Sequence, residues 1–97
     1  MDKSYYVYIL TTRLNTVFYT GVTSDLAKRL FEHRTSAVPG FTQRYNVYKL
    51  VYYEKHTDPF TAITREKQIK AGSRRKKIAL IIQQNPGWRD LHDDIAE

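Results

Sequence analysis

The chain has no cysteine, and that absence removes several kinds of protein from consideration. Without a thiol it contains no zinc ribbon, no CxxC redox site, no cysteine nucleophile and no disulfide-stapled secreted scaffold. The 97-residue length also leaves no room for a second folded unit, because a chain of this size supports one core. The sequence therefore predicts a single domain over residues 1–97.

Long apolar runs are missing as well. No stretch approaches the roughly 18 consecutive apolar residues that a membrane span needs, and the first five residues lack the apolar core of a signal peptide. Repeats, low-complexity tracts and linkers are absent too. We therefore expect a cytoplasmic protein with no membrane partner.

Positive charge is what the chain has in excess. Its formal net charge is +6, and residues 65–77 alone hold seven basic side chains against one acidic. The segment from Trp88 onward is acidic instead. Dense positive charge attracts a polyanion, with nucleic acid the leading candidate. The alternative is a solvated helix face.

Tyrosine is also abundant, with eight in the chain. Three aromatic and β-branched stretches, residues 5–10, 17–22 and 47–54, are predicted to be strands. A hairpin turn centred on Arg13 and Leu14 would place Tyr8 directly opposite Tyr19, on one face of the sheet. The alternative to a functional role is an aromatic pair that fills core. The remaining tyrosines are predicted to lie in the sheet and core; they include Tyr5, Tyr45, Tyr48, Tyr52 and Tyr53.

Helix signals alternate with these strands. A helix over residues 26–34 follows a cap at Thr23-Ser24-Asp25, and a loop covers residues 36–44. Asp58-Pro59 begins a second helix, which ends at Gly72 as a left-handed terminator. Ser73 caps a third helix that continues to Asn85, and a short last helix fits residues 88–95. The order ββαβαα predicts an α+β fold, with a small three-stranded, mainly antiparallel sheet flanked by helices.

The first predicted helix carries polar residues on its apolar face. Leu26, Arg29, Leu30 and His33 follow helical spacing, whereas Glu32 lies off this stripe. Arg29 and His33 are therefore either edge residues, satisfied by solvent or backbone, or members of a site.

The second predicted helix places Glu66 between Ile63 and Ile69. An inward carboxylate must be paired, hydrogen-bonded or bound to a metal. An ion pair with a basic neighbour such as Arg29 is one interpretation, and such a pair can itself belong to an active site.

Two phenols, an arginine, a histidine and a carboxylate at these positions resemble the site of the GIY-YIG nuclease family, in its small single-domain bacterial form. Tyr6-Val7-Tyr8 is similar to the first signature, without its glycine. Tyr19-Thr20-Gly21 is similar to the second. Arg29 and His33 stand at typical spacings, and Arg65-Glu66-Lys67 matches the later helix that carries the metal-binding glutamate.

The similarity extends to the end of the chain. Residues 85–91, from Asn85 to Leu91, look like the tail of small bacterial members. Asn85 is a candidate for the late asparagine of the family, but it stands further from Glu66 than in other relatives. We therefore leave Asn85 out of the predicted site.

The resemblance implies a GIY-YIG-like fold and a metal-dependent endonuclease. Such an enzyme would hydrolyse phosphodiester bonds in DNA, with structure-dependent or weakly sequence-specific cutting and a place in DNA repair or recombination. DNA is favoured over RNA through the family alone. Glu66 would bind one Mg²⁺ or Mn²⁺ ion.

The resemblance also implies roles for the other site residues. Arg29 would hold the scissile phosphate. Tyr8 would act as the base, Tyr19 would position water or phosphate, and His33 would accept a proton from a tyrosine or orient it.

The basic segment would hold flanking phosphates without reading sequence. The predicted nucleic-acid-binding residues are Lys67, Lys70, Arg74, Arg75, Lys76 and Lys77. A protein partner would supply further targeting.

Two other interpretations remain open. One is a nucleic-acid-binding module of the same fold that lacks useful turnover. The other is a protein-interaction domain whose acidic tail docks on a basic partner.

Overall fold

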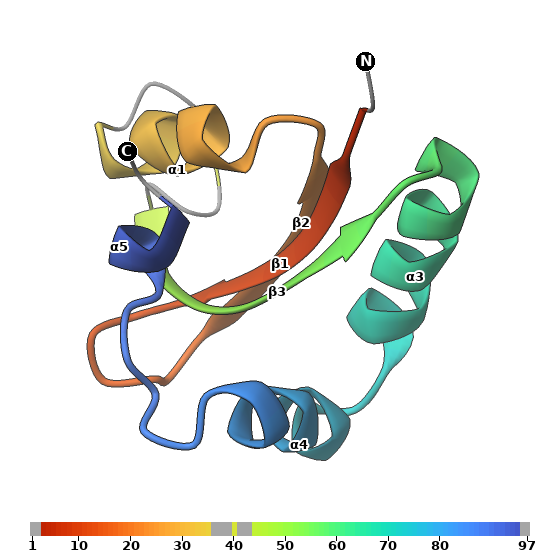
Figure 1. Ribbon diagram of the computed structural model, residues 1–97. Helices are drawn as coiled ribbons and strands as arrows, with labels where there is room; N and C mark the ends of the chain where they lie inside the picture. Colours follow the sequence, from red (N-terminus) through yellow and green to blue (C-terminus); the bar gives the residue numbers. More distant parts are fainter. Residues whose placement is uncertain (1–2, 36–39, 41–43, 96–97) are drawn as a thin grey trace.

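Three antiparallel strands form one sheet between helices in the computed structural model, which describes residues 3–35, 40 and 44–95 (Figure 1). The strands are β1 (Tyr5–Thr11), β2 (Phe18–Thr23) and β3 (Lys49–His56), in the order β2-β1-β3. The helices are α1 (Leu26–Arg34), α3 (Pro59–Ala71), α4 (Arg74–Gln84) and α5 (His92–Ile95). The predicted α+β fold is confirmed. Most of the predicted loop over residues 36–44 lies outside the described residues.

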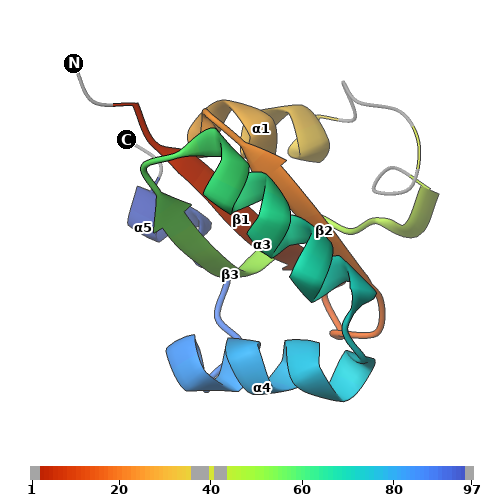
Figure 2. The same cartoon turned by 90° about the vertical axis from the view of Figure 1, so that its right-hand side faces the viewer.

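Helices cover both faces of the sheet. α1 and α5 lie on one side and α3 on the other, with α4 below the sheet in Figure 1. Figure 2 shows α3 running across the strands in front, with α1 behind their upper ends. No helix among the described residues combines the length and the apolar character that crossing a bilayer requires.

Alternation along β1 divides the core between these two sides. Val7 and Ile9 pack with Ile69 of α3 and Ile81 of α4. The residues between and beyond them face the other way: Tyr8 and Leu10 pack with residues of α1 and with the last turns of the chain, namely Leu26, Leu30 and Leu91. Tyr8 is thus fixed by its position in the strand on the α1 side of the sheet.

The register of the hairpin differs from the prediction. Tyr8 lies opposite Gly21, and Tyr19 lies opposite Leu10, so the expected direct pairing of Tyr8 with Tyr19 was wrong. The turn is centred one residue later because Asn15 adopts a left-handed conformation (φ 60°) and donates its N–H to the Thr12 carbonyl at 2.9 Å. The partner of Tyr8 shifts by two residues. Tyr8 and Tyr19 therefore remain on one face as diagonal neighbours.

Gly21 is required by the tyrosine opposite it. A Cβ atom at Gly21 would lie 2.5 Å from the hydroxyl oxygen of Tyr8 and 2.6 Å from Cζ of its ring. The absence of a side chain lets the phenol of Tyr8 lie across β2. Because β2 is an edge strand, the hydroxyl of Tyr8 is carried toward the edge of the sheet.

The predicted helix starts are confirmed. Asp25 accepts the Lys28 N–H at 3.1 Å, Asp58 accepts the Thr61 N–H at 2.8 Å, and Ser73 caps α4. Each cap acts within one turn of its own residue, so local sequence was sufficient to locate these starts.

Gly72 does end α3, but not in the predicted left-handed conformation. Its φ is −72°, and its N–H donates to the carbonyls of Gln68 and Ile69. A Cβ atom there would lie 3.3 Å from the Ile69 carbonyl oxygen. Close packing, together with the immediate start of α4 at Ser73, accounts for the glycine.

Residues 84–91 cover the exposed edge of β3. Asn85 is buried; its Nδ2 donates to the carbonyls of Val51 and Arg89, and its Oδ1 accepts the Arg89 N–H. Asp90 accepts the Leu50 N–H at 3.2 Å. The polar atoms of Asn85 are thus committed to the backbone. They maintain the conformation of this tail, and Asn85 does not offer a free side chain to a site.

The predicted core positions of Tyr45 and Tyr48 were wrong. They are 44% and 43% exposed, and β3 begins only at Lys49. Val47, between them, is buried and fills the core in their place. Tyr52 is buried in the strand, as expected for a residue within β3.

Candidate active site

Two tyrosines and a histidine form a compact cluster at the β2 edge of the sheet. The hydroxyl of Tyr8 lies 3.2 Å from Nε2 of His33. The rings of Tyr8 and Tyr19 are 6.3 Å apart, and those of Tyr19 and His33 are 5.6 Å apart, edge to face. Tyr8 is 1% exposed and His33 4%. Residues from β1 and α1 thus meet in a nearly water-free contact, and the half-buried Tyr19 of β2 lies beside it.

Helix α1 brings a charged pair to this cluster. Its buried face comprises Leu26, Leu30 and His33. Arg29 lies at the border of that face, and its Nε is 3.3 Å from Oε1 of Glu32. Sequence reasoning missed Glu32, although its i, i+3 spacing from Arg29 is a recognised helix pair and could have indicated it.

Glu66 approaches from α3, on the opposite face of the sheet. Its side chain is only 12% exposed, and its carboxylate lies 3.1 Å from Nζ of Lys70. Its ion-pair partner is therefore Lys70 and not Arg29. The charge of Glu66 is close enough to raise the pKa of Tyr8, so it acts on the cluster from the other side of the sheet.

The environment keeps both members of the Tyr8–His33 pair neutral. Burial raises the pKa of Tyr8 well above 10, and Tyr19 and Glu66 add to the rise, whereas Arg29 opposes it. Burial also lowers the pKa of His33 below 6.5, and Arg29 lowers it further. At neutral pH, a protonated phenol therefore stands beside an uncharged imidazole that has a lone pair.

The donor set at Glu66 fits one hard divalent cation. Among the described residues no three histidine, aspartate or glutamate side chains gather as a metal cage. A single carboxylate suits Mg²⁺ or Mn²⁺, which keep several water ligands and take further oxygens from a phosphate. The ammonium of Lys70 lies against the Glu66 carboxylate, so a cation already stands at this carboxylate.

The six predicted nucleic-acid-binding residues do not share one environment. Arg74 donates to the carbonyls of Asn15 and Thr16 and lies over the ring of Phe18. Lys77 donates to the carbonyl of Gly72 at 2.6 Å. Lys70 is paired with Glu66. The other three side chains have no hydrogen bond or ion pair within the described part of the chain; they are Lys67, Arg75 and Lys76.

A second polar cluster lies between β3 and α3. Glu54 accepts from Arg65 Nε at 2.9 Å, from His56 Nε2 at 2.7 Å, and from the hydroxyl of Tyr52. Burial alone would raise the pKa of Glu54, but these three hydrogen bonds hold it below its usual value. Sequence reasoning missed this cluster. The period-two spacing of Tyr52, Glu54 and His56 on one face of a strand was its only signal.

Comparisons with known proteins agree with this architecture. The model of the GIY-YIG catalytic domain matches residues 4–79. A UPF0213 protein of Staphylococcus saprophyticus is 36% identical over 81 residues, which cover 84% of this chain and 96% of the relative. A UPF0213 protein of Syntrophus aciditrophicus is 40% identical over 87 residues, covering 89% and 97%.

A solved structure is similar over nearly the whole chain. The solution NMR structure of a UPF0213 protein from Bacillus halodurans has a TM-score of 0.58 and 26% identity, and the match covers 97% of this chain and 99% of that one. The family model spans both tyrosine signatures, α1 and α3, the segments from which the cluster is built. The chain belongs to the GIY-YIG family.

Proposed function

We propose that this protein is a metal-dependent endonuclease that hydrolyses phosphodiester bonds in DNA, with structure-dependent or weakly sequence-specific cutting. One observation carries the proposal. Tyr8, hydrogen-bonded to an uncharged His33, lies within the electrostatic reach of both Arg29 and Glu66. A domain that only bound nucleic acid would have no use for a carboxylate that acts on the residues of its phosphate site.

Arg29 is the residue that would hold the scissile phosphate. Its planar guanidinium matches two phosphate oxygens, which the point charge of a lysine does not. Its guanidinium is paired with Glu32 on an accessible part of α1. Such a partly exposed pair is weak, so a phosphodiester anion can compete with Glu32 for the guanidinium.

Tyr8 and His33 would move the proton of the attacking water. Tyr8 is a poor base on its own, because burial keeps it protonated. His33 in its Nδ1-protonated form presents Nε2 as an acceptor to the Tyr8 hydroxyl. As water gives its proton to the Tyr8 oxygen, the Tyr8 proton passes to His33, and no isolated tyrosinate is formed.

Tyr19 would position the water or the phosphate. Its ring stands beside both Tyr8 and His33, which fixes its orientation in the cluster. Positioning of this kind contributes by holding reacting atoms in line.

Glu66 would hold the divalent ion, Mg²⁺ or Mn²⁺. When bound, the ion supplies a Lewis acid that stabilises the charge on the leaving 3′ oxygen. Lys70 would then release Glu66 and become available to a phosphate of the DNA. Lys67, Arg75 and Lys76 would contact the backbone further along the strand.

A second candidate is a nucleic-acid-binding module without useful turnover. The raised pKa of Tyr8 favours it, since a base that stays protonated is slow. In that case the basic side chains of α3 and α4 would bind DNA or RNA with strong salt dependence.

The test incubates nicked, branched and single-stranded DNA, and RNA, with the protein and Mg²⁺ or Mn²⁺. We expect the protein to cut a DNA substrate, and we expect Glu66→Gln to abolish this cutting. Glu54→Gln serves as the matched control, because Glu54 is also a half-buried carboxylate on the α3 side, and it should leave the rate at saturating DNA unchanged. Cutting that survives Glu66→Gln would contradict the proposal. Salt-sensitive binding without cutting would support the second candidate.

A further inference from the structure

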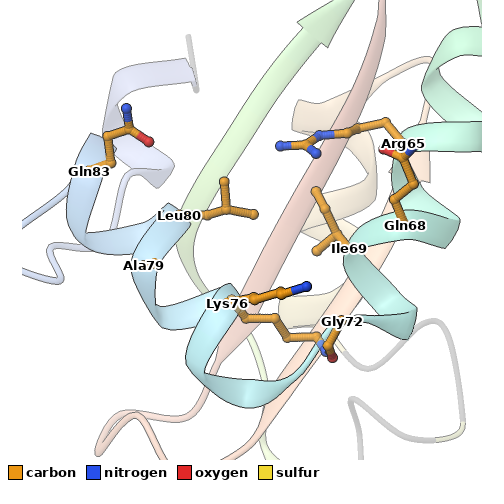
Figure 3. Close-up of a pocket in the computed structure, with 9 residues that line it drawn as sticks. Arg65, Gln68, Ile69, Gly72, Lys76, Ala79, Leu80 and Gln83 are labelled. Atoms are coloured by element: carbon orange, nitrogen blue, oxygen red, sulfur yellow. The ribbon is translucent and has the colours of Figure 1, made fainter.

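A pocket of about 400 Å³ lies between α3 and α4, away from the tyrosine cluster (Figure 3). Its volume is within the range of sites that hold small organic ligands. The side chains of Ile69 and Leu80 point into it from the two helices, and Ala79 adds to its apolar wall. Glu66 and Lys70 do not line it, so it is distinct from the candidate active site.

The rim of the pocket is cationic and amide-bearing. Lys76 and Lys77 contribute positive charge, whereas Arg65 is paired with Glu54. Gln68 and Gln83 stand on opposite helices. No acidic side chain is among the nine that line it. The ligand that complements this pocket has an anionic group, an apolar part and hydrogen-bonding groups.

The two glutamines are available for such a ligand. Neither amide has a hydrogen-bond partner within the part of the chain that the structure describes. A glutamine amide offers one acceptor and two donors, and it pairs well with the edge of a nucleobase. Apolar side chains can hold a base by stacking, as in proteins that extrude a base from the duplex.

We propose that this pocket binds one unpaired nucleotide of the DNA substrate. The base packs against Leu80 and Ala79, its edges face Gln68 and Gln83, and its phosphate contacts Lys76. This inference rests on the proposed function and narrows its substrate class to DNA with an unpaired nucleotide near the cut. A base within an intact duplex is stacked and paired, and its apolar faces are not available to Leu80 and Ala79.

The first test is an NMR titration of the full chain with deoxyadenosine monophosphate. We expect shifts in the side-chain amide signals of Gln68 and Gln83, and much smaller shifts with deoxyribose 5-phosphate, which has no base. Equal shifts with both compounds would overturn the proposal. So would shifts caused by an acidic aromatic peptide and not by the nucleotide, which would identify a protein-docking groove.

The second test fills the pocket. Ala79→Phe places a ring inside it, and Ala71→Phe is the matched control, because Ala71 is an exposed helical alanine that does not line the pocket. We expect Ala79→Phe to weaken binding of a duplex with one unpaired adenosine about tenfold or more, the effect of losing one stacked base. Binding of the fully paired duplex should stay unchanged. Equal effects of the two variants would overturn the proposal.

The third test reverses one charge. Lys76→Glu and Arg75→Glu lie in the same first turn of α4, so they change net charge and helix electrostatics alike, but only Lys76 lines the pocket. Lys76→Glu should reduce the preference for the unpaired nucleotide. Arg75→Glu should weaken binding of both duplexes equally. The reverse pattern would contradict the assignment of the phosphate to Lys76.

Failure of this inference and failure of the proposed function give different results. If Glu66→Gln abolishes cutting but Ala79→Phe has no effect, the pocket assignment is wrong and the nuclease stands. If Ala79→Phe weakens binding but no substrate is cut, the pocket assignment stands and the nuclease is wrong.

Discussion

Two polar clusters lie on opposite faces of the same sheet, and they handle charge in opposite ways. On the α1 side, Tyr8 and His33 share one hydrogen bond, and burial drives both toward their neutral forms. On the α3 side, Glu54 is held ionised by three donors, although burial acts against its charge. Burial opposes charge at Tyr8, His33 and Glu54 alike, so the number and kind of partners decide the difference.

That difference separates a fixed network from a responsive one. Every partner of Glu54 stabilises its charged form, and Arg65 carries a permanent opposite charge, so the cluster resists change. The Tyr8–His33 pair has charges at its border, on Arg29 and Glu66, but none within it. A substrate phosphate or a cation arriving there would alter both pKa values. The Tyr8–His33 arrangement suits proton transfer, and the Glu54 arrangement suits stability.

The largest effect is expected from Tyr8→Phe. Loss of the hydroxyl removes the proton acceptor and should lower the cleavage rate by about 10²–10⁴-fold, with a stability change of only about 1 kcal/mol. Tyr52→Phe is the matched control, because it removes the hydroxyl of a buried tyrosine from the other cluster. Single-turnover cleavage and urea unfolding measure the two effects. Equal cleavage losses in the two variants would show that the clusters do not differ in function.

Gly21→Ala should be next in size. The new Cβ clashes with the ring and hydroxyl of Tyr8, so we expect a loss of about 1–3 kcal/mol in the free energy of unfolding. Cleavage should fall as the hydroxyl is displaced from His33. In a Tyr8→Ala background the same substitution should cost much less, which a double-mutant cycle would measure. Additive effects would refute this contact as the cause.

Glu54→Gln should affect stability alone. The amide cannot accept from all three donors, and we expect a loss of about 1–2 kcal/mol in the free energy of unfolding, while cleavage at saturating DNA is retained. Thermal or urea unfolding beside a cleavage assay measures both. A large loss of cleavage with little loss of stability would reverse the roles given to the two clusters.

The smallest effects are two separate pH windows of stability. The pKa of His33 is lowered in the folded protein, so the unfolded chain takes up its proton first, and stability falls as pH drops below about 6.5. The pKa of Glu54 is lowered as well, so its contribution is present above about 4.5 and is lost as pH falls further. His33→Gln should reduce the loss of stability that begins below about pH 6.5. Glu54→Gln should reduce the loss that begins below about pH 4.5. Urea unfolding from pH 7 to 3 measures both, with each variant as control for the other.

Local features were predictable because their causes are local. The caps at Asp25, Asp58 and Ser73 act on backbone groups three residues away, so a short stretch of sequence contains both partners. The register of the hairpin was not predictable in this way. It depends on the left-handed conformation of Asn15, for which the sequence offered no Asn-Gly signature.

Partners across the fold were the hardest to predict. Glu66 was expected inward with a basic neighbour such as Arg29. Its partner is Lys70, one turn further along the same helix, because α3 and α1 lie on opposite faces of the sheet. The Glu54 cluster joins Glu54 of a strand to Arg65 of a helix, eleven positions further along the chain. Its charge balance could be seen only when both elements were in place.

The sequence by itself determined the alternation of strands and helices, the tyrosine, arginine and glutamate spacings that indicated the GIY-YIG family, and the location of the positive charge. Tertiary structure decided which polar groups lose their water. Helical packing on both faces of the sheet made Tyr8 and His33 neutral and kept Glu54 charged. It also divided the basic segment among backbone contacts, the Glu66 pair and the rim of a pocket. The physical reason is that desolvation and charge pairing depend on distances between elements, which the order of residues along a chain does not contain.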